Sequence, residues 1–270
     1  MEKRYIISEM TIYLASFSTP NFSKSHTVLD KSARRNGVEI FFHYTFDKDV
    51  KGTPFYEKNR AIFDIPRGIG FWLWKPYLIL ESLKKMAEND ILVYADAGLE
   101  IIKPLDNVLE ICEKQENIVF FQAHGYKNKV ATHRDTFVLM NADTPPYHDA
   151  EMVQASFILF KKTKKTLDFV EEWLLYCENI DIISDLRNVS GQPNFEGFIH
   201  HVGDQSVVSI LRIKHDIPIF RNPSQQGNDH ISAFPNSPYP QLINHHWGRP
   251  DGRFAGPLRR ILLKFGIWRF

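Results

Sequence analysis

Short apolar runs alternate along the chain with longer segments that have a helical period. Residues 11–17, 38–44, 91–95, 118–122 and 155–160 are apolar or aromatic runs of the length expected for buried strands. Apolar positions recur every three or four residues over 76–87, 104–114, 167–177 and 204–211, which predicts helices. Strands alternating with helices predict an α/β fold, with a mostly parallel sheet covered by helices on both faces.

Two stretches, 45–67 and 190–201, show neither period. Unstructured loops of that length inside a compact domain are usually functional or mobile, so we expect both to take part in substrate selection. The 270 residues allow one large domain or two small ones. We assign residues 1–256 to one domain, followed by a distinct tail at 257–270.

Composition narrows the class of protein. The 33 basic and 32 acidic residues nearly cancel, which argues against a nucleic-acid binder that relies on a broad positive field. Cys112 and Cys177 both fall in helical patterns, so we expect buried thiols in a reducing compartment. Since no apolar run approaches the ~18 residues of a membrane-spanning helix, we expect a soluble, cytoplasmic protein.

The strand predicted at 91–95 is followed at once by Asp96, Ala97 and Gly98. In α/β sheets, ligands bind outside the carboxyl ends of the strands. Asp96 is therefore either a common turn former or a ligand of a cation or a ribose. In the second case, its two small neighbours let a bulky phosphate compound approach the backbone.

Residues 94–98 (YADAG) resemble the Asp-x-Asp segment of the GT-A-fold glycosyltransferases, which transfer a sugar from a nucleotide-sugar donor. The resemblance implies a Rossmann-like GT-A domain in which Asp96 binds the donor and a divalent cation, Mn²⁺ or Mg²⁺. Gly98 stands where the family has its second Asp, so we expect a more weakly held metal.

Residues 67–77 (RGIGFWLWKPY) resemble a bacterial and viral branch of these enzymes with a Gly-Tyr-Trp-x-Trp-Lys-Pro core. In the wider family a basic residue on this helix reaches the donor, which implicates Lys75 and Arg67. The alternative is a solvated Lys75. For Trp72 and Trp74, core packing and an acceptor-binding aromatic surface are equally open, since sugar rings pack well on aromatic faces.

Residues 204 and 205 resemble the Asp-Gln pair of the retaining glycogenin and bacterial lipooligosaccharide galactosyltransferase type. The resemblance implies that Asp204 and Gln205 face the transferred sugar as catalytic groups, although Asp204 also fits a helix N-cap. Residues 152–157 (MVQASF) are similar to the same group's Asn-Ala-Gly segment, which implies that Gln154 and Ala155 touch the donor.

Residues 244–253 (NHHWGRPDGR) resemble the late His-x-x-Gly segment of that group. Adjacent histidines on a strand point to opposite faces, so only one joins a given site. The spacing to Gly248 selects His245 as the metal ligand beside Asp96, a ligand pair compatible with manganese. Arg249 or Arg253 would then bind the diphosphate, and Trp247 would contact the acceptor.

The resemblance covers roughly residues 11–253 and also places the end of the first strand at the donor. The implied donor-binding residues are Ala15, Ser16, Phe17, Arg67, Lys75, Tyr94, Ala95, Asp96, Gln154, Ala155 and Arg249. The implied acceptor-binding residues are Trp72, Trp74 and Trp247.

The tail, residues 257–270 (PLRRILLKFGIWRF), combines an apolar helical stripe with basic residues. That pattern is typical of an interfacial helix on an anionic membrane, and a helix packed on the domain is the alternative. We therefore expect a transferase acting on a glycan or lipid-linked acceptor, with retention of configuration. Cell-envelope polysaccharide or lipopolysaccharide synthesis, at the inner face of the membrane, is the expected setting.

Three other functions remain open. A catalytically inactive glycan-binding or membrane-associated scaffold would share the fold, and Gly98 is compatible with it. A sugar nucleotidyltransferase would need a glycine-rich basic loop after the first strand, where this chain has residues 17–22 (FSTPNF). A metal phosphoesterase would need more closely grouped ligands than the sequence shows.

Overall fold

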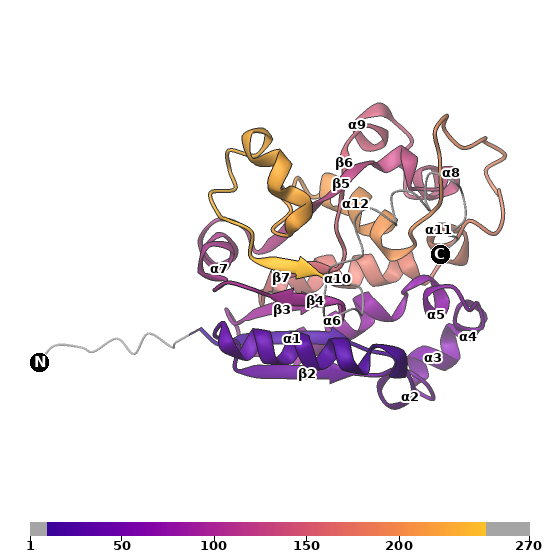
Figure 1. Ribbon diagram of the computed structural model, residues 1–270. Coiled ribbons are helices and arrows are strands. Elements are labelled where there is room, and N and C mark those ends of the chain that lie inside the picture. The colour runs from indigo at the N-terminus through magenta and orange to yellow at the C-terminus, as the bar shows by residue number, and fades with distance from the viewer. Residues whose placement is uncertain (1–9, 247–270) are drawn as a thin grey trace, which may run out of the picture.

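The structure, a computed structural model, describes residues 10–246. A sheet forms its centre, and helices lie on both faces (Figure 1). The strands are β1 (Ile12–Phe17), β2 (Ile40–Tyr44), β3 (Ile91–Ala95), β4 (Leu99–Ile101), β5 (Ile118–Lys127), β6 (Glu151–Val153), β7 (Phe157–Lys161), β8 (Ile219–Phe220) and β9 (Ile243–His245). The central sheet has the order β2-β1-β3-β7-β5-β6 with β8 paired to β5, and β4 pairs with β9 separately.

The longer helices match the predicted apolar periods, and short helical segments fill the connections. The α-helices are α1 (Ser23–Arg35), α2 (Phe46–Asp49), α3 (Pro54–Lys58), α4 (Arg60–Phe63), α5 (Gly68–Phe71), α6 (Trp74–Lys84), α7 (Asp106–Lys114), α8 (Arg134–Leu139), α9 (Pro145–His148), α10 (Lys164–Cys177), α11 (Ile180–Ile183) and α12 (Asp204–Lys214). The 3₁₀ helices are η1 (Pro20–Phe22), η2 (Asn128–Val130) and η3 (Gln225–Ala233).

The direction of strand β7 decides what lies at the end of strand β3. Strands β1, β2 and β3 pair in parallel, so their carboxyl ends share one edge of the sheet. Strand β7 runs antiparallel to β3, with Phe157 opposite Ala95. The residues just before β7 are therefore brought beside the residue just after β3, and the backbone N–H of Asp96 donates to the Ser156 carbonyl at 2.8 Å.

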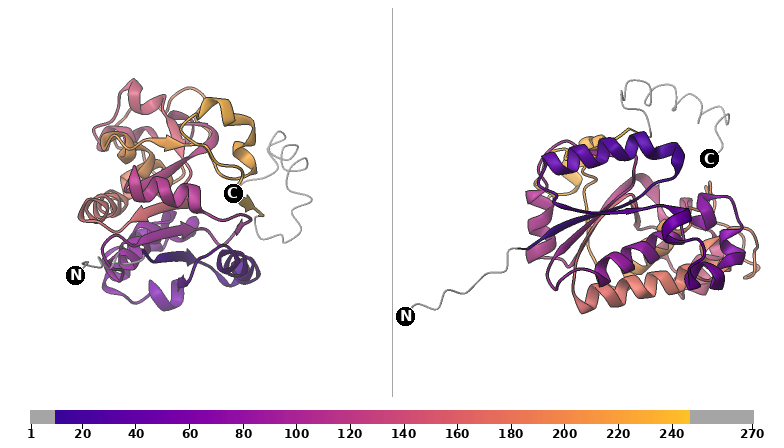
Figure 2. Two further views of the ribbon diagram at one scale, coloured as in Figure 1. Left: turned by 90° about the vertical axis from the view of Figure 1, so that its left-hand side faces the viewer. Right: turned by 90° about the horizontal axis from the view of Figure 1, so that it is seen from below.

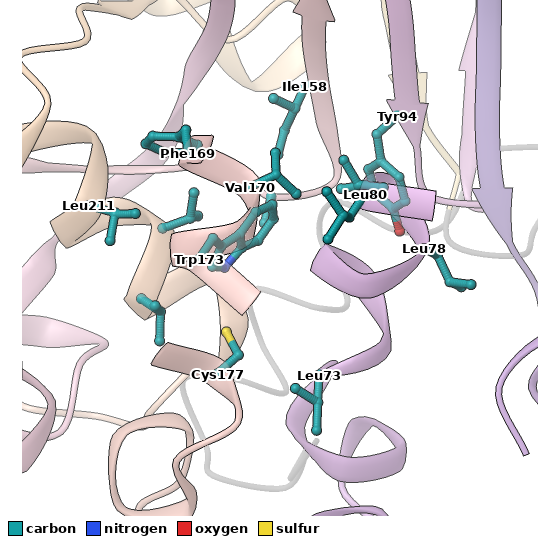
Figure 3. Packing of buried hydrophobic residues seen from close by; sticks show 14 of the residues in the cluster. Leu73, Leu78, Leu80, Tyr94, Ile158, Phe169, Val170, Trp173, Cys177 and Leu211 are labelled. Atoms are coloured by element: carbon teal, nitrogen blue, oxygen red, sulfur yellow. The ribbon is translucent and has the colours of Figure 1, made fainter. Parts of the chain in front are cut away.

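The sheet separates two apolar cores. One core lies against α6, α10 and α12, and the other lies against α1 and α7. Figure 2 (right) shows the indigo helix α1 on one side of the strands and the salmon helix α10 on the other. Trp173 and Val170 of α10 lie with Leu80 of α6 and Tyr94 of β3 in the first core (Figure 3). Burial on both faces explains why β3 is apolar throughout.

The predicted α/β class and the helices on both faces are confirmed. Element ends differ by a few residues: α6 begins at Trp74, α10 at Lys164, and β7 at Phe157. The stretch 45–67 is not a structureless loop, because it holds α2, α3 and α4. Helices of four or five residues are too short to show a repeating apolar stripe, so periodicity missed them.

Both cysteines are buried and free, as predicted: Cys112 lies in α7 and Cys177 in α10. Within residues 10–246, no helix combines the length and apolar character needed to cross a membrane. The tail at 257–270 and the domain boundary at 256 lie outside the described residues.

Candidate active site

A buried lysine joins three segments that are far apart in the sequence. The Nζ atom of Lys75, in α6, lies 3.4 Å from Asp96 Oδ1 and 3.7 Å from Asp204 Oδ2. It also donates a hydrogen bond to the Ala155 carbonyl at 3.0 Å. We call Lys75, Asp96 and Asp204 the Lys75 triad. Residues 67–77 and residues 204–205, which the sequence analysis selected on separate grounds, thus meet at the end of β3.

The three members of the triad differ in exposure. The side chains of Lys75 and Asp204 are 5% and 3% exposed, whereas that of Asp96 is 42% exposed. Asp96 is therefore the member that an incoming ligand can reach. Tyr94, two residues earlier, donates its hydroxyl to Asp96 Oδ1 at 2.7 Å and so fixes the carboxylate from within the protein.

Burial controls the protonation of this group. Desolvation raises the pKa of Asp204 to about 7, and the charge of Asp96 adds to this effect while Lys75 opposes it. Burial alone would lower the pKa of Lys75, but the charges of Asp204 and Asp96 outweigh it, so that pKa is raised. Desolvation, followed by the charge of Asp96, raises the pKa of Tyr94 well above its ordinary value. Lys75 is thus a cation and Tyr94 a neutral donor at pH 7.

The segment before α6, which includes α5, is a left-handed turn and not a regular right-handed helix. Its five consecutive positive φ angles are those of Gly68 (59°), Ile69 (53°), Gly70 (77°), Phe71 (54°) and Trp72 (63°). For residues other than glycine, this conformation costs roughly 1–2 kcal/mol each. Strain of this kind persists where surrounding contacts fix the backbone, and it is concentrated at functional sites.

Contacts with the segment before α12 hold this turn. A Cβ atom on Gly203, where φ is +57°, would lie 2.5 Å from the Phe71 carbonyl oxygen, so only glycine permits the approach. Arg67 donates to the His201 carbonyl and to both carboxylate oxygens of Asp185, at 3.1 and 3.2 Å. The turn that precedes Lys75 and the segment that precedes Asp204 are therefore fixed to each other.

Arg67 and Trp74 both have structural contacts within the protein. Arg67 binds Asp185 and the His201 carbonyl and not the carboxylates of the triad. The Trp74 side chain is buried, its ring stacks on Phe17 with centroids 3.8 Å apart, and its N–H donates to the Gly68 carbonyl. Burial of the Trp74 ring favours core packing, the other function considered for this residue, over contact with an acceptor. Trp72 is partly exposed, and its role stays a prediction.

The segment before β7 lies beside the triad. Gln205 accepts a hydrogen bond from the Ala155 N–H at 3.4 Å, and Gln154 is buried with its Oε1 bonded to Asn222. Asn222 also donates to the Gln122 carbonyl at 3.0 Å. The Gln154 Nε2 atom is buried and has no hydrogen-bond partner within the described residues. The sequence pattern did not indicate Asn222, since its one signal is its place just after the short strand β8.

The end of β1 lies one strand away from the end of β3. In the register of these parallel strands, Ala15 is opposite Tyr94. The segment that ends β1 is buried at Ala15, Ser16 and Phe17. A donor would therefore contact it only where the strand ends, at the carboxyl edge of the sheet. The Ser16 hydroxyl has no hydrogen-bond partner among the described residues. Contact of these residues with a donor stays a prediction.

Strand β9 carries the late histidines to the loop after Asp96. It pairs with β4, placing His245 opposite Leu99, and Figure 1 shows the yellow β9 beside β4. The His246 N–H donates to the Gly98 carbonyl at 3.0 Å, and the buried His246 ring bonds to the Leu99 carbonyl. His246 is thus structural, and His245 is half-buried. Trp247, Arg249 and Arg253 lie outside the described residues.

Comparison with known proteins identifies the architecture. No protein-family model matches the sequence, and no curated protein matches it significantly. The galactosyltransferase LgtC, solved with donor and acceptor sugar analogues, is 16% identical. That match covers 95% of this chain and 96% of LgtC, with a TM-score of 0.50. The chain has a GT-A fold. Mouse xyloside xylosyltransferase 1 is 12% identical, over 87% of this chain and 97% of its own, with a TM-score of 0.46.

Proposed function

We propose that the protein is a glycosyltransferase that uses a nucleotide-sugar donor. The observation that carries this proposal is the Lys75 triad, a buried ammonium held at the carboxyl edge of a GT-A sheet by two carboxylates. Cleaving the bond between a sugar and a diphosphate leaves negative charge on the phosphate. A fixed positive group in a water-poor site stabilises that charge as it develops.

The residues of the triad have separate roles in this proposal. Asp96, the exposed member, binds the donor, and the small Ala97 and Gly98 leave room for it. Lys75 supplies positive charge toward the phosphates. Asp204 is too buried to lie open to a ligand, so its first task is to hold Lys75 in place. Gln205 bonds to the Ala155 N–H, and Gln154 has an Nε2 atom without a partner in the described residues, so both amides are proposed to contact the sugar.

The residues present fit a divalent cation with few protein ligands. Asp96 and His245 would hold it, because β9 lies against the loop that follows Asp96. Such an ion would add Lewis-acid stabilisation of the leaving diphosphate. Gly98 contributes no ligand, and within residues 10–246 no third acidic, histidine or cysteine side chain completes a cluster there. Manganese or magnesium is therefore expected to bind weakly until the diphosphate supplies further oxygens.

We also propose retention of anomeric configuration and a glycan or lipid-linked acceptor in cell-envelope polysaccharide or lipopolysaccharide synthesis. Retention is supported by the resemblance of Asp204 and Gln205 to the retaining type. The envelope setting, at the inner face of the membrane, is supported by the basic, apolar pattern of residues 257–270. Trp72, Trp247 and Arg249 remain proposed contacts to acceptor and diphosphate.

A thermal-shift screen tests the donor proposal. UDP-, GDP-, CMP- and dTDP-sugars are each added with manganese, with magnesium and with EDTA. We expect one nucleotide class to raise Tm. We expect Asp96→Asn to lose that shift, and Asp168→Asn, in a surface ion pair on α10, to keep it. No shift with any donor, for folded protein, would contradict donor binding.

Slow hydrolysis of the bound donor separates an enzyme from an inactive scaffold, because active transferases leak some donor sugar to water. We expect the nucleotide class that raises Tm to be hydrolysed by the wild-type protein and not by Asp96→Asn. Binding without hydrolysis or transfer would favour the scaffold.

A further inference from the structure

Three potential metal ligands meet between helix α1 and strand β2, on the side of the sheet opposite α6. His26 and Asp30 lie one turn apart on α1, and His43 is the next-to-last residue of β2. His43 Nδ1 lies 3.0 Å from His26 Nε2, and His43 Nε2 lies 3.6 Å from Asp30 Oδ2. One ligand atom from each residue can be chosen so that all three lie within 4.8 Å of one another.

These separations are close to those of a tetrahedral metal site. With metal–ligand bonds of about 2.0–2.1 Å, neighbouring ligand atoms lie about 3.3 Å apart. The two short contacts use the two nitrogens of the same His43 ring. A shared ion would require one nitrogen of that ring to face both His26 and Asp30, which is a change in the His43 side chain.

The carboxylate of Asp30 supplies an independent indication of a ligand. Its Oδ1 atom is buried and has no hydrogen-bond partner within the described residues. An unsatisfied buried carboxylate oxygen is costly unless a cation or a donor binds it. Arg34, one turn further along α1, does not serve this purpose, because its guanidinium lies over the Phe41 ring, 4.1 Å from the centroid.

From this geometry we propose that His26, Asp30 and His43 bind a zinc-type divalent cation. Two imidazoles and one carboxylate are a ligand set that zinc prefers, and the partial exposure of His43 and Asp30 leaves a fourth position for water. Strand β2 is an edge strand, and its neighbour in the sheet is β1. The ion would connect α1 to β2 and so stabilise the attachment of this edge strand. The proposal does not rest on the proposed transferase function.

Zinc titration of the chelator-treated full-length protein tests the site. Calorimetry with zinc chloride should show one saturable equivalent, and Tm should rise with zinc but not with the same concentration of magnesium. His26→Gln and His43→Gln should each weaken zinc binding by about tenfold or more, because either change removes a direct ligand.

His215→Gln is the matched control. His215 also pairs with a carboxylate, Glu172, at 2.7 Å and with similar exposure, but it has no third ligand in its group within residues 10–246. This variant should bind zinc as the wild-type protein does. Absence of a saturable equivalent would overturn the proposal. Wild-type affinity in both the His26 and the His43 variants, confirmed as folded by circular dichroism, would also overturn it.

Discussion

Lys75 is a buried charge whose position depends on two carboxylates from other segments. Its ammonium has direct contacts with Asp96, Asp204 and the Ala155 carbonyl, and the Tyr94 ring lies 5.2 Å away. Removing one partner of a buried ion pair is far more damaging than removing a surface pair, because the remaining charge is left without compensation. The stability of this protein and its capacity to bind a donor should therefore depend on the same side chain.

Lys75→Met tests that dependence. It should lower the free energy of unfolding by about 3 kcal/mol, since Asp96 and Asp204 are then left facing each other. It should also abolish the Tm shift with donor. Urea denaturation at pH 7 measures the first effect. Lys84→Met is the control: Lys84 is on the same helix in a surface pair with Glu81, and its loss should cost no more than about 1 kcal/mol. Equal losses in both variants would contradict a special role for Lys75.

Asp204 should make stability depend on pH. Its folded pKa of about 7 lies above the ordinary carboxyl value, so the folded state keeps a proton that the unfolded state releases. The stability linked to this proton is fully present below about pH 4 and is lost as the pH rises through about 7. Asp204→Asn should therefore reduce the fall in unfolding free energy between pH 5 and pH 8, measured by urea denaturation. An unchanged slope would show that Asp204 ionises normally.

At the scale of elements, the left-handed turn and the start of α12 form one unit. The turn contacts Gly203 through the Phe71 carbonyl, and Arg67 joins the same two segments through His201. Because Lys75 and Asp204 each follow directly after one of these segments, their separation is set by this backbone contact. Residues 67–77 and residues 203–205 therefore form one structural unit that positions Lys75 and Asp204.

Gly203→Ala tests this unit. The added Cβ would lie 2.5 Å from the Phe71 oxygen, so the turn and α12 must separate. Unfolding free energy should fall by about 1–3 kcal/mol, and the donor-induced Tm shift should be lost. Gly191→Ala is the control, with φ at +71° but nothing within 4 Å of the added atom. Both variants carry left-handed strain, so retention of donor binding in both would show that the close contact is unimportant.

At the scale of the whole molecule, the sheet separates the two proposed sites. The Lys75 triad depends on α6 and α12, while the proposed cation site depends on α1 and β2. A ligand on one side need not change the other directly, since the strands and their apolar cores lie between them. Donor binding and zinc binding should thus be separable by point mutation.

Membrane attachment is also a property of the whole molecule. Deleting residues 257–270 should weaken binding to liposomes containing anionic lipid, because the basic and apolar side chains there match an interfacial helix. Activity on a soluble acceptor should remain. Co-sedimentation with liposomes measures the first effect, with neutral liposomes as the control. Equal sedimentation of the full-length and truncated proteins would contradict the proposal.

The sequence by itself determined the elements whose signal is local. The apolar runs at 91–95 and 118–122 and the helical periods at 167–177 and 204–211 each reflect side chains that must be buried along one segment. The position of Asp96 directly after such a strand allowed either a turn former or a ligand-binding carboxylate, and the family resemblance favoured the second. The assignment of Lys75 came from a resemblance and not from any pattern of burial.

Tertiary structure alone decided which distant residues meet. Trp74 and Lys75 are adjacent in sequence, yet one is a core residue stacked on Phe17 and the other pairs with Asp96 and Asp204. The antiparallel direction of β7, which brings Ala155 to Lys75, leaves no mark in the local pattern of the strand. Local patterns record whether a residue is buried. The partner of a buried charge depends on how segments far apart in the sequence pack, and only the folded chain fixes that.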